Sequence, residues 1–318
     1  LWLFSLWYLP GNKVFVPVSG HKRLPEKGMI YSVQSRIKTK ERRMSQTLDN
    51  KEQLDALAKE IRYVITDIIC RAGSGHIGGA LSLVEIMITL YYRVMNVRPS
   101  EPRWDDRDRF ILSKGHAGPV LYTVLAYKGY FPMSWLPTLN KNGTNLPSHV
   151  DQLKTPGVDM TAGSLGQGIS AAVGIAEACR LKKKSNHVFC IVGDGESQEG
   201  QVWEASMYAA HRKLDNLIAI LDCNRMQIDG TTDEINSLGS PADKWRSFGW
   251  EVFEINGHDW DEILSAVNKA KEVKGKPTMI VAHTVKAKGN ACVEGTVGSH
   301  NIKIANEADY KKYLSGTS

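Results

Sequence analysis

The hydrophobic pattern of the chain switches repeatedly between two periods. Short apolar runs rich in β-branched residues predict buried strands, and they lie at 110–112, 187–192, 217–221, 251–255 and 278–282. Between these runs, apolar residues recur at helical spacing and predict helices, which lie at about 51–71, 117–127, 168–183, 200–213, 242–248 and 260–273. Strands that alternate with helices predict an α/β fold, with a parallel sheet sandwiched by helices.

Two segments depart from this alternation. A glycine-rich loop at 73–79 leads into a helix that is expected to begin near Ser82, with Glu85 three residues on as the partner in a capping box. Residues 129–160 are rich in Pro, Gly and Asn and predict a long irregular excursion, of the kind that often carries function in a compact domain.

Composition separates residues 1–43 from the rest of the chain. They hold nine of the 40 Lys and Arg residues and two of the 34 Asp and Glu residues, which leaves 31 basic and 32 acidic side chains in residues 44–318. We interpret 1–43 as a disordered extension of uncertain origin and 44–318 as one domain. The apolar stretch at 1–10 is too short to span a bilayer and lacks the charged segment that precedes a secretory signal.

The charge balance and the cysteines narrow the class of protein further. The only basic run of the domain, at 182–184, closes a predicted helix, where cations favour the helix dipole. We therefore expect neither a nucleic-acid partner nor a membrane partner. The five cysteines show no zinc-binding spacing, and four fall in or within two residues of predicted helices or buried strands. This pattern favours free thiols in a reducing compartment and a cytoplasmic location.

An oxygen-bearing side chain follows each of two neighbouring predicted strands. Asp194 lies between Gly193 and Gly195 after the strand at 187–192, and Asn224 follows the strand at 217–221. The carboxyl ends of parallel strands meet at one edge of the sheet, which is where ligands bind in open α/β sheets. Hard oxygen ligands suit Mg²⁺ or Ca²⁺ bridged to a phosphate, and a glycine beside them leaves room for a bulky anion.

The sequence Gly-Asp-Gly, followed after 28 residues by Asn, resembles the signature of thiamine diphosphate enzymes. From about residue 50 to 286, the chain is similar to the N-terminal, diphosphate-binding part of transketolase. The similarity rests on eight stretches in the family's order, which are SGHIGGALS (74–82), SKGHA (113–117), LPSHVD (146–151), TAGSLGQG (161–168), GDGESQEG (193–200), LDCNRMQIDG (221–230), GHD (257–259) and AHTVKAKG (282–289).

The resemblance implies a cofactor site built on thiamine diphosphate and Mg²⁺, with Ca²⁺ or Mn²⁺ as alternative metals. The metal ligands that it implies are the side chains of Asp194 and Asn224 and the backbone carbonyl of Met226. The cofactor contacts that it implies are His116, Gly163, Ser164, Leu165, Gly193, Asp194, Gly195, Glu196 and Asn224. Ser164 stands where the family has a proline, so the loop loses a fixed φ but keeps its backbone contacts.

Four histidines match family positions that contact the diphosphate or substrate hydroxyls. His76, His116 and His149 lie in matched motifs and are expected to line the channel over the cofactor, while His300 lies in the tail after Gly289, where the family pattern changes. We assign all four to catalysis, together with two glutamates, Glu199 and Glu204, whose family counterparts lie at the subunit contact. Four other histidines are interpreted as structural, and they are His187, His211, His258 and His283.

The family also needs a glutamate on a pyrimidine-binding domain, and residues 287–318 offer no second α/β domain. The resemblance therefore predicts the N-terminal subunit of a split transketolase, an enzyme of carbohydrate metabolism and the pentose phosphate reactions. It would transfer a two-carbon ketol unit from a ketose or ketose phosphate to an aldose or aldose phosphate. The partner that we expect is a separate C-terminal transketolase subunit, in a heterotetramer.

Three alternatives stay open on the sequence. Two are enzymes: a subunit similar to 1-deoxyxylulose-5-phosphate synthase, and one similar to the α subunit of a 2-oxo acid dehydrogenase. The third is a non-catalytic thiamine-fold scaffold, against which the intact pair of Asp194 and Asn224 argues. The sugar substrates, the partner's identity and the alignment of the tail are not fixed by these motifs.

Overall fold

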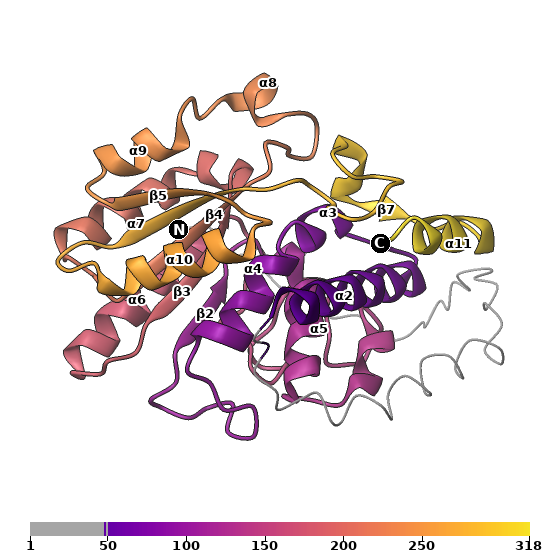
Figure 1. Cartoon of the computed structure of the whole chain (residues 1–318), viewed down its shortest axis with the longest axis horizontal. Coiled ribbons are helices and arrows are strands. Elements are labelled where there is room, and N and C mark those ends of the chain that lie inside the picture. The colour runs from indigo at the N-terminus through magenta and orange to yellow at the C-terminus, as the bar shows by residue number, and fades with distance from the viewer. Residues whose placement is uncertain (1–47, 49) are drawn as a thin grey trace, which may run out of the picture. The chain divides into compact units, whose positions relative to one another are not determined.

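The computed structural model describes residue 48 and residues 50–318 (Figure 1). The described residues belong to one compact unit. The predicted extension at 1–43 and the predicted start of the domain at Met44 lie outside the described residues. Of the helices in the described part of the chain, none has both the length and the apolar character needed to cross a membrane.

A five-stranded parallel sheet forms the centre of the domain. Its strands, in spatial order, are β2 (Arg109–Leu112), β3 (Val188–Gly193), β4 (Leu217–Cys223), β6 (Thr278–His283) and β5 (Glu251–Asn256). Each lies within two residues of a strand predicted from the hydrophobic runs. In the register of β3 and β4, Gly193 is paired with Asp222. The segments that follow these two strands are therefore neighbours at one edge of the sheet.

The main helices also follow the predicted pattern, and they are α2 (Lys51–Ala72), α5 (Gly118–Lys128), α6 (Gln167–Leu181), α7 (Gly200–His211), α9 (Pro241–Ser247) and α10 (Trp260–Glu272). Helix α2 begins where the Asn50 side chain accepts a hydrogen bond from the Gln53 amide at 2.9 Å. It ends at Gly73, whose φ of 85° lies in the left-handed region that favours glycine.

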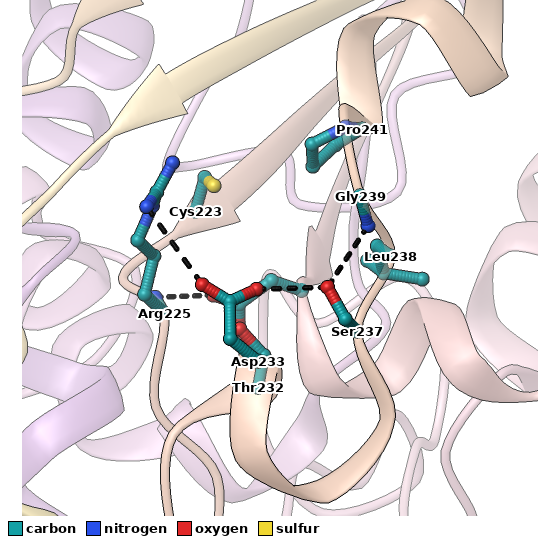
Figure 2. A pocket seen from close by; sticks show the side chains of 9 residues that line it. Cys223, Arg225, Thr232, Asp233, Ser237, Leu238, Gly239 and Pro241 are labelled. Atoms are coloured by element: carbon teal, nitrogen blue, oxygen red, sulfur yellow. Dashed lines mark hydrogen bonds and ion pairs between the residues drawn. The ribbon is translucent and has the colours of Figure 1, made fainter.

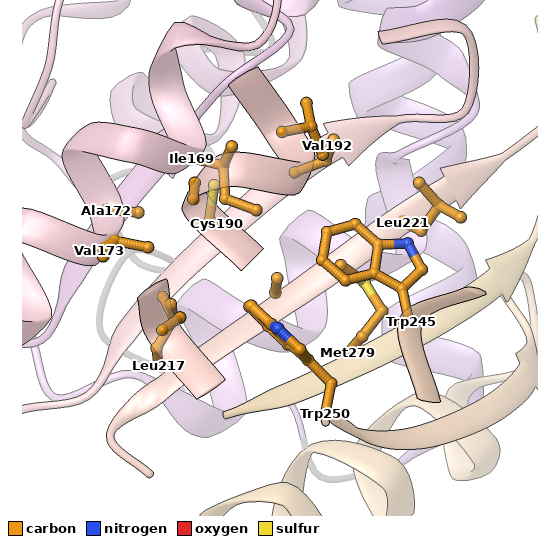
Figure 3. Close-up of a cluster of buried hydrophobic side chains, with 14 of the residues drawn as sticks. Ile169, Ala172, Val173, Cys190, Val192, Leu217, Leu221, Trp245, Trp250 and Met279 are labelled. Atoms are coloured by element: carbon orange, nitrogen blue, oxygen red, sulfur yellow. The ribbon is translucent and has the colours of Figure 1, made fainter. Parts of the chain in front are cut away.

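Helices α6, α7 and α9 share one hydrophobic core with the sheet (Figure 3). The alternate residues Val188, Cys190 and Val192 of β3 all belong to this core, as the two-residue period of a strand requires. Trp245 of α9 is fully buried, and Trp250, which precedes β5, packs edge-on against it with ring centroids 4.9 Å apart. Helix α10 lies in front of the sheet in Figure 1.

The segment from 74 to 94 differs from its prediction. Two short helices, α3 (Ile77–Leu81) and α4 (Val84–Thr89), replace the single helix that was expected to begin near Ser82, and a π-helical turn follows at Leu90–Val94. The predicted capping box is wrong, because both of its side chains bond to distant residues. The Ser82 hydroxyl donates to Asp222 at 2.6 Å, and Glu85 is paired with Arg62.

The tail of the chain returns to the glycine-rich loop near its beginning. Strand β7 (Ile302–Lys303) pairs antiparallel with β1 (Ser74–Gly75), and α11 (Glu307–Ser315) packs on α2. This return places His300, just before β7, beside His76, just after β1. The excursion at 129–160 carries a 3-10 helix (Met133–Thr138). The other short helices among the described residues are α8 (Thr232–Asn236) and the 3-10 helices Gly115–Ala117, Gly195–Gln198 and Val297–His300.

Candidate functional site

Four histidines from separate loops meet at the carboxyl edge of the sheet. The centroid of the His76 ring lies 5.2 Å from that of His116, 5.5 Å from that of His149 and 5.3 Å from that of His300. The rings of His116 and His300 are also 5.3 Å apart. The sequence predicted all four as site residues, and the structure brings them together. We call them the histidine cluster.

The histidine cluster is held in its neutral form. Burial, with His149 and Lys286 nearby, lowers the pKa of His76, and burial lowers the pKa of His149. Burial and the Lys114 charge hold the pKa of His116 well below its ordinary value. Burial, followed by the Lys286 charge, lowers the pKa of His300 to about 4. Neutral imidazoles can both donate and accept hydrogen bonds, which suits the recognition of hydroxyl groups.

Acid is therefore expected to destabilise the domain through the histidine cluster. The pKa of His300 is about 4 in the folded chain and 6.5 ordinarily, so the unfolded chain binds protons first as the pH falls from 6.5 towards 4. Between pH 7 and pH 5, the free energy of unfolding should therefore fall by about 1 kcal/mol less in His300→Gln than in the wild type. The expected difference is no larger because solvent screens the part-exposed ring. Urea unfolding at both pH values measures this. His211→Gln, on the exposed surface of α7, should follow the wild type, and equal losses in all three proteins would contradict the expectation.

The three predicted metal ligands lie together, immediately after β3 and β4. The Asp194 carboxylate accepts hydrogen bonds from the Gly195 amide at 2.8 Å and from the Arg225 amide. The Asn224 side-chain oxygen accepts from the Met226 amide at 3.1 Å. Asp194 is 3% exposed, and burial, with the neighbouring charge of Asp222, raises its pKa to about 6. A carboxylate in this setting is stabilised by a bound cation.

Asp222 orients the Asn224 side chain from the end of β4. It is completely buried and accepts a hydrogen bond from Asn224 Nδ2 at 3.0 Å, which turns the amide oxygen the other way. It also accepts from Ser82 and Thr284, and it forms an ion pair with Lys114. Burial alone would raise the pKa of Asp222, but Lys114 and these hydrogen bonds outweigh it and keep the pKa below its ordinary value.

Lys286 joins the predicted metal ligands to the histidine cluster, although it was not itself predicted as a site residue. Its ammonium donates to the Met226 carbonyl at 3.1 Å and lies 3.4 Å from Nδ1 of His300. Burial and the Lys114 charge lower its pKa to about 8. The signal was present, because Lys286 lies within the matched stretch AHTVKAKG, but a lysine has no distinctive spacing there.

These residues fit a divalent cation that carries a diphosphate. The donors are a carboxylate, an amide oxygen and a backbone carbonyl, which are oxygen ligands that Mg²⁺ accepts. In the described part of the chain, no group of three or more His, Cys, Asp or Glu side chains could hold a metal ion alone. A cation here would complete its shell with phosphate and water, as Mg²⁺ prefers. Lys286 could offer a positive charge to the phosphates, and the neutral histidines could offer N–H donors.

Two other predicted segments flank this edge. Gly163 and Ser164 are exposed and Leu165 is half-buried, in the loop that leads to α6. The loop is anchored at Gly166, whose amide donates to Glu196 at 2.9 Å. Glu196 is buried, and its carboxylate also accepts from Ser113 and from the Gly193 amide. Its side chain therefore ties three loops together, and direct contact with a cofactor stays a prediction.

Glu199 and Glu204 lie at the beginning of α7. Glu199 is at the N-cap, and both side chains are exposed. Met207 and Tyr208 of the same helix are 54% and 48% exposed, which is high for large hydrophobic residues. The exposed part of α7 thus combines carboxylates with apolar side chains.

A polar cavity of about 350 Å³ lies beside Asp194 (Figure 2). Figure 2 shows Arg225 facing Asp233, and Asp233 accepting a hydrogen bond from the Ser237 hydroxyl at 2.9 Å. The residues that line the cavity are Asp194, Cys223, Arg225, Thr232, Asp233, Ser237, Leu238, Gly239 and Pro241. Asp194, one of the predicted metal ligands, lines the cavity, but no residue of the histidine cluster does.

Comparison with known proteins gives one family for this chain. Residues 54–314 match the family model described as transketolase, thiamine diphosphate binding domain. The chain is 54% identical over 250 residues to the 6-deoxy-6-sulfo-D-fructose transketolase subunit SqwG of Clostridium sp. (strain MSTE9), with 79% of this chain and 91% of that one covered. It is 38% identical over 250 residues to a subunit of the apulose-4-phosphate transketolase of Phocaeicola vulgatus, with 79% and 89% covered.

Solved structures agree with the sequence relatives. The transketolase from Campylobacter jejuni superposes with a TM-score of 0.79 at 34% identity, over 84% of this chain and 43% of that one. The chain thus spans less than half of that enzyme, but nearly the whole length of the two relatives that are named as subunits. The predicted α/β fold, with its helix-covered parallel sheet, is confirmed as that of a thiamine diphosphate-binding domain.

Proposed function

The chain belongs to the transketolase family through its thiamine diphosphate-binding domain, and we propose that it is the diphosphate-binding subunit of a two-chain transketolase. The support is that relatives of similar length are named transketolase subunits. The family match favours this function over the synthase-like, dehydrogenase-like and scaffold alternatives. Residues 44–318 would form the domain, and a separate subunit would bring the pyrimidine-binding domain, in a heterotetramer.

The proposed reaction transfers a two-carbon ketol unit from a ketose to an aldose. Thiamine diphosphate, when bound, supplies the electron sink that lets the bond between C2 and C3 of the ketose break. The observation that carries the proposal is the histidine cluster, which Lys286 links to the Met226 carbonyl in the loop that also carries Asn224. Asp194, Asn224 and the Met226 carbonyl would hold Mg²⁺.

The side chains of the site would bind, orient and move protons. Neutral histidines of the cluster can accept a hydrogen bond from one substrate hydroxyl and donate to another, and can take up a proton from a hydroxyl and return it. Lys286, which touches both the Met226 carbonyl and His300, would bind phosphate oxygens. The Gly163–Leu165 loop is proposed to support the cofactor through its backbone.

The exposed part of α7 is proposed to lie at the subunit contact. Glu199 and Glu204 would lie between the halves of the assembly, as their exposure and the neighbouring apolar side chains support. Burial of Met207 and Tyr208 by another subunit would remove apolar surface from water, at roughly 25 cal/mol per Å².

The first donor to test is 6-deoxy-6-sulfo-D-fructose, because the relative named for it is 54% identical to this chain. Removal of carbons 1 and 2 would leave a four-carbon aldose with a terminal sulfonate, and an acceptor aldose would gain the two carbons. We expect the chain, assayed with its partner subunit, Mg²⁺ and thiamine diphosphate, to release this product.

A panel of donors makes the assay decisive. Fructose 6-phosphate and xylulose 5-phosphate serve as phosphorylated comparisons, and each product is identified by mass spectrometry. If a phosphorylated ketose reacts and the sulfonated ketose does not, the proposed ketol transfer stands and the proposed donor is wrong. Failure of every donor in an assembled, cofactor-loaded complex would contradict the proposed function.

A further inference from the structure

The backbone on both sides of Lys286 is held by side chains from distant parts of the chain. The Val285 amide donates to Nε2 of His258 at 2.9 Å, and the Lys288 carbonyl accepts from Nε of Arg62 at 3.0 Å. These hydrogen bonds hold the loop one residue before Lys286 and two residues after it. The loop follows β6, whereas His258 follows β5 and Arg62 lies on α2.

One buried carboxylate connects the two side chains that bind the loop. Nδ1 of His258 lies 3.1 Å from one oxygen of Glu85, and the other oxygen forms an ion pair with Arg62. The side chains of Arg62, Glu85 and His258 are only 7%, 9% and 12% exposed, so little water can replace a lost partner. We call these three residues the loop clamp.

The hydrogen bonds define the tautomer of His258. Because Nε2 accepts from the Val285 amide, it carries no proton, and Nδ1 carries the proton that is donated to Glu85. Burial would raise the pKa of Glu85, but His258 and Arg62 outweigh it and lower the pKa. The histidine is thus a bridge that accepts from the loop and donates to a charged carboxylate.

The packing around the clamp and around Lys286 is close. A Cβ atom at Gly289 would lie 2.6 Å from Cδ of Arg62, so a side chain there would displace the arginine from the Lys288 carbonyl. On the other side, a Cβ atom at Gly78 would lie 2.9 Å from Cγ of Lys286. Glycine at both positions lets the clamp and the lysine approach closely.

We propose that His258, through Glu85 and Arg62, is a positioning residue that holds Lys286 against the Met226 carbonyl and the histidine cluster. This inference rests on the proposed function for the ligand that Lys286 would bind, but the clamp itself rests on geometry. His258 touches neither cofactor nor substrate. It acts by fixing the backbone from which Lys286 reaches the site.

Two substitutions of His258 separate its two bonds. In His258→Asn, the amide nitrogen takes roughly the place of Nδ1 and keeps the bond to Glu85, but nothing accepts from Val285. In His258→Gln, the side chain reaches the position of Nε2 and restores an acceptor. His283→Asn is the matched control, because His283 is half exposed at the end of β6 and pairs only with Glu254 among the described contacts.

Calorimetry of Mg²⁺–thiamine diphosphate binding to the full chain and its partner subunit gives the first readout. His258→Asn should weaken binding by roughly 10- to 100-fold, as loss of a group that orients a ligand does, while His258→Gln recovers much of the loss and His283→Asn changes nothing. In a Lys286→Met background, His258→Asn should add no further loss. Full additivity of the two losses, or unchanged binding in His258→Asn, would overturn the proposal.

The second readout needs no cofactor and separates the two possible failures. Nitrogen NMR of the His258 ring should show a proton on Nδ1 and none on Nε2. Hydrogen exchange of the Val285 amide should become at least about tenfold faster in His258→Asn, which corresponds to the loss of one hydrogen bond. If this readout holds and the wild-type complex does not bind the cofactor, the proposed function fails and the clamp stands. Unchanged Val285 exchange would overturn the clamp.

Discussion

Asp194→Ala is expected to weaken magnesium-dependent binding of thiamine diphosphate by at least about 100-fold, or roughly 2.7 kcal/mol. Asp194 is the only carboxylate among the three proposed metal ligands, and it is almost fully buried beside Asn224. Without it, the divalent cation keeps only two neutral protein ligands, an amide oxygen and a carbonyl oxygen, and the protein holds the cation and its diphosphate less tightly. Isothermal titration with cofactor and Mg²⁺ measures the loss.

Two further variants show whether the loss comes from the charge. Asp194→Asn keeps the size of the side chain, should lose cofactor affinity nearly as far as Asp194→Ala, and should leave the melting temperature of the metal-free protein within a few degrees. This follows because burial and the Asp222 charge raise the pKa of Asp194 to about 6, so the metal-free fold disfavours the charge and its removal should not destabilise the domain. Asp229→Ala, an exposed carboxylate on the neighbouring loop, should bind as the wild type does. Unchanged binding in Asp194→Asn would remove Asp194 from the metal ligands.

Lys114→Met is expected to destabilise the domain by about 3–5 kcal/mol, because it leaves the charge of Asp222 buried without its ionic partner. Both side chains are inaccessible, at 3% and 0% exposure. A loss of this size is a large fraction of the roughly 5–15 kcal/mol that typically stabilises a domain. Urea unfolding at constant pH provides the measurement.

Two comparisons distinguish this ion pair from a surface interaction. The double variant Lys114→Met with Asp222→Asn removes both charges and should recover part of the loss, so the two single effects will not add. Lys184→Met breaks pairs with Asp105 and Asp106, whose side chains are 64% and 60% exposed, and should cost less than about 1 kcal/mol. Equal losses in Lys114→Met and Lys184→Met would contradict the account of the buried pair.

The sheet and its main helices could be predicted because their signal is local. The run at 187–192 is apolar from Val188 onward, and β3 is buried throughout. Helix α2 was predicted from its periodic apolar residues, and in the structure it begins after Asn50 and ends at Gly73. Such patterns depend only on neighbours in the sequence.

The site could be predicted only where residues fall in recognisable motifs. The histidine cluster was predicted from separate loops, and the structure brings it together. The capping box at Ser82 and Glu85 was wrong because Asp222 and Arg62, far away in the sequence, compete for those side chains. Lys286 and the clamp at His258 were missed for the same reason. Their partners come from other elements, and no spacing along the chain reports such contacts.

The measurement that tests the account most directly is ketol transfer by the purified chain, alone and with increasing amounts of its partner subunit. If the chain holds only the diphosphate half of a cofactor site, it should show no turnover alone, at saturating Mg²⁺ and thiamine diphosphate. Activity should rise with added partner and saturate at a ratio of one to one. Full turnover by the chain alone, with contaminating transketolase excluded, would contradict the two-chain account.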